Sequence, residues 1–162
     1  MAVLDTNEIF YTTFEPKTKN RGITYIDGIP AFIVYKMKKP SFTVPSKEVH
    51  HINSYFTFAG KRKWDTASLT AYDPVTPSGA QAFMDWCRLT YEAATGRAGY
   101  LDFYKKDIVY DDLGPVGDIV SEWVYKGAWV SKFDPGEVDW TNEGDAQELS
   151  IEITYDYAIL NF

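Results

Sequence analysis

Few side chains in this sequence have the types and spacing that catalysis or metal binding requires. The only histidines form the adjacent pair His50-His51. Neighbouring residues on a strand point to opposite faces, so the two imidazoles cannot easily share one metal ion. An exposed or interface position is the simpler interpretation of this pair.

Two acidic stretches offer carboxylates, and each has a simpler explanation. The stretch from Asp134 to Asp145 is rich in oxygen ligands of the kind calcium prefers, but its spacing does not match an EF-hand loop. Asp111-Asp112 could serve as an acid–base pair, yet Gly114 and Pro115 beside it favour an ordinary loop. An ion site and a carboxylate pair stay open as alternatives to solvated loops.

Cys87 is the single cysteine, so no intramolecular disulfide can form. It lies on the apolar stripe of a predicted helix with no histidine near it in sequence, which favours a packed thiol over a nucleophile. The P-loop, GxSxG, HExxH and SxxK patterns are absent. We therefore predict that the protein is not an enzyme and has no cofactor and no metal.

The composition indicates one β-rich domain that has partners. The chain has 162 residues, of which 45% are hydrophobic and 17% aromatic, with a formal net charge of -7. Aromatic side chains favour half-buried strands and interfaces. The excess of acid argues against binding a nucleic-acid backbone. Neither a signal peptide nor a transmembrane segment is expected, so we predict no membrane association.

Alternating apolar residues predict the strands that must carry any site. Leu149, Ile151, Ile153, Tyr155, Tyr157 and Ile159 are expected on one face of a long final strand, opposite Ser150, Glu152, Thr154 and Asp156. Ala67, Leu69 and Ala71 show the same period within a strand from Trp64 to Tyr72. Further strands are expected at residues 24–26, 31–39, 100–109 and 119–130, with a connection at 111–118.

One amphipathic helix is predicted over about residues 79–95. Ser78 is a suitable N-cap, Gln81 completes a capping box, and Gly96 fits the position after the helix. Residues 47–58 are expected to be a strand or an arm of an extended hairpin. The predicted fold is mainly β, an antiparallel β-sandwich or barrel with one α-helix, in which residues 1–30 are an N-terminal arm and 31–162 a single domain.

The stretch from Lys126 to Trp140 concentrates aromatic residues around a turn at Pro135-Gly136. Trp129, Phe133 and Trp140 all lie within it. Trp129 and Trp140 could cap the core, or the turn could lie where subunits meet, with its aromatic side chains as buried anchors. Both interpretations stay open from the sequence.

An ordered set of short elements resembles the tail-tube proteins of contractile-tailed bacteriophages, a superfamily that includes secretion tubes. The set spans residues 58 to 160 and consists of Gly60-Lys61-Arg62-Lys63-Trp64-Asp65 leading into Thr66–Tyr72, Phe83-Met84-Asp85-Trp86, Lys126-Gly127-Ala128-Trp129, Val138-Asp139-Trp140 and Thr154-Tyr155-Asp156-Tyr157. The first 30 residues correspond least to that family.

The resemblance implies a structural protein of the virion. Hexameric rings with a continuous luminal β-barrel would stack into a hollow tube, assembled in the bacterial host cytoplasm, through which viral DNA passes without specific binding. Implied partners are further copies of the chain, a sheath protein, a baseplate and a tail terminator. Residues 40–63 would be an extended loop between rings.

Candidate sites follow from the resemblance together with the strand pattern. Residues expected to line the lumen are Glu122, Ser150, Glu152, Thr154 and Asp156; residues expected at subunit interfaces are Trp129, Phe133, Trp140, His50, His51 and Tyr55. An acidic wall would repel phosphates and let DNA slide. Alternatives are a tube subunit of a bacteriocin or type VI-like secretion system, a baseplate or tail-tip protein, and a β-sandwich that binds carbohydrate.

Overall fold

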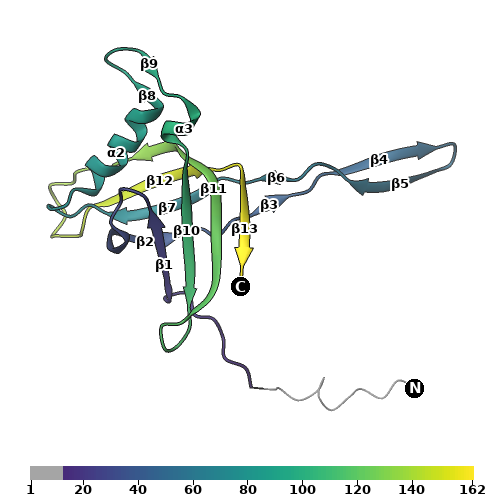
Figure 1. Ribbon diagram of the computed structural model, residues 1–162, viewed down its shortest axis with the longest axis horizontal. Helices are drawn as coiled ribbons and strands as arrows, with labels where there is room; N and C mark the ends of the chain where they lie inside the picture. The colour runs from purple at the N-terminus through teal and green to yellow at the C-terminus, as the bar shows by residue number, and fades with distance from the viewer. Residues whose placement is uncertain (1–12) are drawn as a thin grey trace.

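The computed structural model describes residues 13–162 and is mainly β, with antiparallel strands and one main helix (Figure 1). The first 12 residues of the predicted N-terminal arm lie outside the described part. The elements are β1 (Gly22–Ile26), a 3-10 turn η1 (Ala31–Ile33), β2 (Val34–Met37), β3 (Phe42–Thr43), β4 (Ser46–His51), β5 (Ser54–Ala59), β6 (Lys63–Trp64), β7 (Ala67–Tyr72), α2 (Gly79–Thr90), β8 (Tyr91–Glu92), β9 (Arg97–Ala98), α3 (Leu101–Tyr104), β10 (Lys106–Leu113), β11 (Ile119–Asp134), β12 (Glu148–Thr154) and β13 (Tyr157–Asn161).

Strand β11 is long enough to belong to two layers of the sheet. Its first half pairs with β10 and β13, and β1 follows β10 at the edge; we call this layer sheet I. Its second half pairs with β12, followed by β7 and β2; we call this layer sheet II. Figure 1 shows β11 curving from one layer into the other. All of these pairings are antiparallel, as the sequence predicts.

The change of layer occurs at Gly127, whose φ is 64°. Before this glycine the core-facing residues of β11 are Trp123 and Tyr125, and after it they are Ala128 and Val130, so the alternation shifts by one residue. The partner strand shifts at the same level, where the Asp156 amide donates to the Lys126 carbonyl at 3.0 Å. A left-handed φ is inexpensive only for glycine, which explains why the bend is placed there.

Gly127→Ala is expected to destabilise the unassembled chain more than Gly117→Ala does. Both glycines have a positive φ, so both substitutions incur backbone strain of about 1–2 kcal/mol. A Cβ at Gly127 would in addition collide with the Asp156 carboxylate, whereas nothing lies within 4 Å of a Cβ at Gly117. Urea unfolding of the two variants measures the difference, and equal losses would contradict the role given to the Gly127–Asp156 contact.

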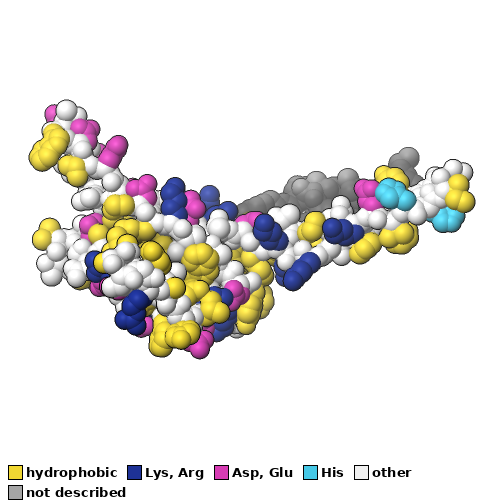
Figure 2. Space-filling view, turned by 90° about the horizontal axis from the view of Figure 1, so that it is seen from above, with side chains coloured by type: hydrophobic (Ala, Val, Ile, Leu, Met, Phe, Trp, Pro, Cys, Tyr) yellow, Lys and Arg dark blue, Asp and Glu magenta, His cyan; other side chains and the backbone are white. Residues whose placement is uncertain are grey.

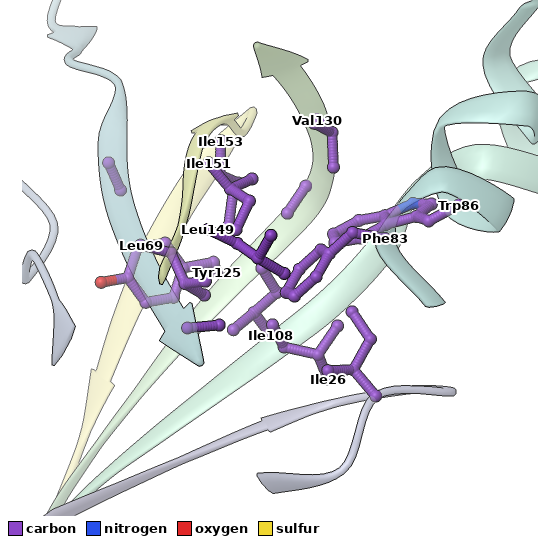
Figure 3. Close-up of a cluster of buried hydrophobic side chains, with 14 of the residues drawn as sticks. Ile26, Leu69, Phe83, Trp86, Ile108, Tyr125, Val130, Leu149, Ile151 and Ile153 are labelled. Carbon is purple, nitrogen blue, oxygen red and sulfur yellow. The ribbon is translucent and has the colours of Figure 1, made fainter. Parts of the chain in front are cut away.

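The core lies between the two layers and is closed at one side by α2. Ile26, Ile108 and Tyr125 of sheet I face Leu69, Ile151 and Ile153 of sheet II, and Phe83 and Trp86 of α2 complete the cluster (Figure 3). Trp86 is fixed by its indole, which donates to the Tyr104 carbonyl at 2.7 Å. The predicted period of Ala67, Leu69 and Ala71 is confirmed, because all of them are fully buried.

Helix α2 begins as predicted, with the Ser78 hydroxyl accepting a hydrogen bond from the Gln81 amide, but it ends at Thr90 rather than near residue 95. The chain turns back at once through the β8–β9 hairpin, whose Tyr91 pairs with Ala98. Gly96, with φ 70°, therefore lies in a hairpin turn and not behind the helix. The predicted C-terminal end of the helix is wrong for this reason.

Other predicted boundaries also differ from the structure. Residues 101–104 form the short helix α3 rather than strand, and 31–33 form the 3-10 turn. Strand β1 pairs with β10, so part of the predicted 1–30 arm belongs to the main sheet. The predicted final strand is divided into β12 and β13, and Tyr157 and Ile159 are exposed instead of buried because the alternation shifts at Asp156.

Candidate assembly surfaces

One outward face of sheet II carries most of the predicted lumen-lining residues. Ser150, Glu152 and Thr154 point away from the core, since they alternate with the fully buried Leu149, Ile151 and Ile153. The strand register adds further side chains to this polar face of sheet II, namely Lys36, Ser68, Thr70, Lys132, Asp134 and Glu148.

The charges on this polar face are mixed. Lys132 lies 4.0 Å from Glu152, and Lys36 pairs in register with Thr70 beside Ser150. The expected wall of acid is therefore wrong for this face, because lysines from neighbouring strands lie among the carboxylates. The sequence period identified the face but not the residues that other strands contribute.

The structure does not place Glu122 and Asp156 with the other lumen candidates. Glu122 lies in the first half of β11, in sheet I, where its carboxylate accepts a hydrogen bond from the Asn161 amide at 2.8 Å. Asp156 lies at the junction of β12 and β13 and is paired with Lys105 at 2.8 Å. Both residues are polar, as are the outward residues of β12. Neither lies in β12, however, because Glu122 belongs to sheet I and Asp156 lies where the alternation shifts.

The Asp111-Asp112 pair lies inside β10 and is buried, so the predicted loop at 111–118 begins only after Leu113. Asp112 points to the core side, where Lys39 contacts both of its oxygens at 2.7 Å and Ser121 donates at 2.9 Å. Burial raises the pKa of Asp112, but these donors outweigh it and hold the pKa below its usual range. Asp112 thus joins sheet I to the segment before β3.

The extended segment predicted at 40–63 is an amphipathic hairpin that projects from the body. Strands β4 and β5 contact each other along their whole length, and every residue in them is exposed. Val49, Phe56 and Phe58 lie on one face of this projecting hairpin, whereas Glu48, Thr57 and His50 lie on the other. Figure 2 shows the hairpin reaching away from the rest of the molecule, with histidine side chains at its tip.

The histidine prediction agrees with this geometry. His50 pairs in register with Tyr55, and their rings lie 6.0 Å apart, while His51 lies on the opposite face. His50 Nε2 lies 3.5 Å from the Glu48 carboxylate. His50, His51 and Tyr55 therefore lie on a surface that is free to contact another molecule, which keeps their interface role as a proposal.

The predicted aromatic cluster is divided between strand and loop. Phe133 is partly buried against the core, with its ring 6.5 Å from that of Phe83, and Trp129 lies 6.4 Å from Tyr104. Trp140 is 94% exposed in the loop after β11. Phe133, expected at an interface, thus packs against the core, and the core-capping interpretation is wrong for Trp140.

In the acidic loop after β11, side-chain oxygens accept hydrogen bonds from donors of the same loop. Asp139 accepts hydrogen bonds from the Thr141 amide and hydroxyl, which lower the pKa of its carboxyl. Asn142 accepts from the amides of Gly144 and Asp145. Over residues 13–162 no group of three or more His, Cys, Asp or Glu side chains is arranged to hold a metal ion.

The described part of the chain also has no helix long and apolar enough to cross a membrane.

No protein-family model matches the chain, and no curated protein matches it in sequence. Among solved structures, a chain from the tube-terminating cap of the anti-feeding prophage is similar, with a TM-score of 0.76 and 13% identity over 98% of this chain and 99% of that one.

Two further neighbours come from an extracellular contractile injection system named PVC. A chain from its extended sheath–tube complex has a TM-score of 0.71 and 16% identity over 98% of this chain and 99% of that one. A chain from its sheath/tube terminator has a TM-score of 0.75 and 15% identity over 93% of this chain and 100% of that one. The chain therefore has the fold of the tube proteins in these contractile assemblies, as its resemblance to tail-tube proteins predicts.

Proposed function

We propose that this chain is the repeating structural subunit of the inner tube of a contractile injection machine. The observation that carries the proposal is likeness over nearly the whole of both chains, 98% and 99%, to a chain from a sheath–tube complex. The shared fold therefore extends over nearly all of the sequence compared. In this role the protein has no catalytic step to perform.

Open strand edges and the projecting hairpin support assembly into rings. β1, β2 and β13 each have one edge without a partner strand in the described chain, and such edges are usually protected or paired. A two-stranded hairpin is marginally stable alone in water, so the fully exposed β4–β5 unit suits docking on another subunit. We propose hexameric rings that stack through this hairpin, with sheath, baseplate and terminator proteins as partners.

We further propose that the polar face of sheet II lines the channel. It is a hydrated face on long strands, and a closed ring would bring copies of β12 around one axis. Its mixed charges give a surface that neither concentrates nor strongly repels an anionic cargo. Cargo would then pass without specific binding, whether it is viral DNA or protein.

Electron microscopy of the purified chain is the direct test of this function. Hollow tubes of stacked rings in negative stain, with a particle mass that grows with concentration, are the expected result. A chain that stays monomeric at high concentration by light scattering, and shows no tubes, would overturn the proposal.

The kind of machine has two candidates. The resemblance in sequence is to phage tail tubes, which deliver DNA from a capsid within a virion. The likeness in structure to chains of the PVC system favours an extracellular injection system instead. Particles purified from the source distinguish them, because a DNA-filled head identifies a phage and a headless particle identifies the second candidate.

Lysines on the channel face are expected to slow cargo delivery without affecting assembly. Ser150→Lys with Glu152→Lys adds positive charge to exposed positions of β12, and many copies along a tube would hold DNA through its phosphates. Asp156 is unsuitable because Lys105 pairs with it. Glu143→Lys, on the exposed loop, is the matched control. Normal infectivity or toxin delivery by a variant whose tubes look intact would contradict the assignment of the lumen.

A further inference from the structure

Two carboxylates lie next to each other on the outward side of sheet I. Asp111 of β10 and Glu122 of β11 are direct partners in the strand register, and Ile23 of β1 lies on the other side of Asp111. Their chain neighbours Tyr110 and Trp123 pack against the core, so the two acids point outward. Like charges directly opposite each other destabilise a sheet.

Asp111 is buried although it is an acid. It is only 5% exposed, and its Oδ1 is buried without a hydrogen-bond partner within residues 13–162. A buried carboxylate oxygen that accepts no hydrogen bond costs free energy. The ionised form of Asp111 is therefore poorly accommodated at this position.

The cations of β11 and of the segment before β3 are bound to other acids. Lys126 of β11 lies 2.6 Å from the Asp107 carboxylate. On the core side of β10, Lys39 contacts Asp112 at 2.7 Å. Neither ammonium group is left to neutralise Asp111.

The N-terminal side supplies no partner either. Lys17 donates to the Ser121 hydroxyl at 2.7 Å, on the core side of the sheet. Arg21 directly precedes β1, and within the described chain it forms no ion pair with either carboxylate. Residues 1–12 contain no lysine or arginine. A proton from the solvent is the cation that can reach Asp111 in the free subunit.

Protonation of Asp111 is linked to folding. Burial, followed by the negative charges of Glu122 and Asp112, raises the pKa of Asp111 above its ordinary value of 3.8. The folded chain then holds a proton that the unfolded chain has released. Stability from such a group is complete below the ordinary pKa and is lost as the pH rises through the raised pKa.

Glu122 connects this site to the last strand. Its Oε1 accepts a hydrogen bond from the side-chain amide of Asn161, the last residue of β13, at 2.8 Å. No hydrogen bond within residues 13–162 occupies its Oε2. In the described chain β13 has β11 as its one partner strand (Figure 1). Asp156, bound to Lys105, holds the start of β13, and Glu122 holds its far end.

We propose that Asp111 is a proton-dependent link that fastens the far end of β13 to sheet I. Its neutral carboxyl donates a hydrogen bond to Glu122, which keeps its other oxygen for Asn161. We call these three residues the acid link. When Asp111 releases its proton to the solvent, two carboxylates oppose each other, and the end of β13 loosens. The inference concerns the free subunit and does not depend on the proposed tube.

Thermal unfolding between pH 4.5 and pH 8 tests the link, at a concentration where light scattering finds single subunits. Asp111→Asn keeps the size of the side chain, and its amide donates at every pH as the neutral carboxyl would. The natural chain is expected to lose up to about 3–5 °C in Tm per pH unit relative to this variant, because one proton is involved. Glu143→Gln, in the exposed loop, is the control and should follow the natural chain.

The difference between the two chains is the quantity to measure. Asp107, Asp112 and Asp139 have lowered pKa values, so their contribution to stability rises with pH. Both chains contain these three acids, and their effect cancels in the comparison. Equal pH dependence of the natural chain and Asp111→Asn would overturn the inference.

Glu122→Gln separates the link from burial alone. The new amide can donate to the Asp111 carboxylate, while its oxygen still accepts from Asn161. The pH dependence of Tm is therefore expected to be smaller in this variant than in the natural chain. An unchanged pH dependence would mean that burial alone acts on Asp111, and the link would be refuted.

Hydrogen–deuterium exchange shows whether β13 responds to the proton. The natural chain and Asp111→Asn are compared at the same pH, so intrinsic exchange rates are equal. At pH 8 the amides of β13 should exchange faster in the natural chain, at pH 4.5 the two chains should agree, and β12 should not differ at either pH. Equal exchange of β13 at pH 8 would overturn the inference. A lower Tm of Asp111→Asn at pH 8 would overturn it too, because a cation such as Arg21 would then hold Asp111 ionised.

Discussion

Replacing the apolar face of the projecting hairpin with Val49→Ser, Phe56→Ser and Phe58→Ser is expected to abolish tube formation while leaving the subunit folded. These side chains are 43%, 64% and 51% exposed, so the isolated subunit gains little stability from them. They lie together on one face of β4 and β5, where a neighbouring ring would cover them. Fully burying such a side chain contributes about 1.5–3 kcal/mol. A contact repeated around a ring would lose several times that amount.

The opposite face of the same hairpin supplies the control. Glu48→Ser and Thr57→Ser change exposed residues of the same strands, at positions that alternate with the apolar ones. The control chain should form tubes at nearly the natural concentration. Sedimentation and negative stain measure assembly, and thermal unfolding measures the fold. Tubes formed by the apolar-face variant, or a large fall in its melting temperature, would contradict the assignment of this face to contacts between rings.

The alternation of apolar and polar residues made the buried and exposed faces of β12 in sheet II predictable. Leu149, Ile151 and Ile153 repeat with the period of a strand, and burial follows because one face of an antiparallel layer packs on the core. Ser150 and Glu152 could be placed on the other face by the same rule. The helix start could be predicted for a similar reason, since Ser78 and Gln81 act within one turn.

The change of layer could not be predicted, because it depends on two strands far apart in sequence. The period continues through Tyr155, Tyr157 and Ile159, yet the chain bends where Asp156 meets Lys126. Beyond that point Ala158 packs against the core, and Ile159 turns outward. Only the left-handed Gly127 on β11 marks the bend, and a glycine alone has several possible meanings.

The same limit applies to the charges. The sequence favours a loop at Asp111-Asp112, because Gly114 and Pro115 follow closely, but both residues lie within β10. The two side chains have different surroundings. Asp112 is bound by Lys39, which is distant in sequence, and Asp111 lies opposite Glu122 because of the register of β10 on β11. Acidic composition suggested repulsion of nucleic acid, but composition could not show which acids are paired within the subunit.

Trp140→Ala and Phe133→Ala are expected to separate assembly from folding within one aromatic cluster. Phe133 is partly buried and packs against the core near Phe83, so its loss leaves a cavity and should cost the fold about 2–4 kcal/mol. Trp140 is 94% exposed, so its loss should leave the free energy of unfolding nearly unchanged. The two variants therefore differ first in thermal unfolding of the unassembled chain.

Trp140→Ala is expected to weaken tube formation, although it leaves the free energy of unfolding nearly unchanged. Tryptophan is among the residues that most often dominate interfaces, where truncation costs about 2 kcal/mol or more. Trp140→Ala should then raise the concentration needed for tube formation by about thirtyfold at each such contact. Light scattering against concentration measures this threshold, with Val138→Ala, exposed in the same loop, as the control. A Trp140→Ala chain that assembles at the natural concentration would place this side chain outside the contacts between subunits, and the loop after β11 would then face solvent in the tube.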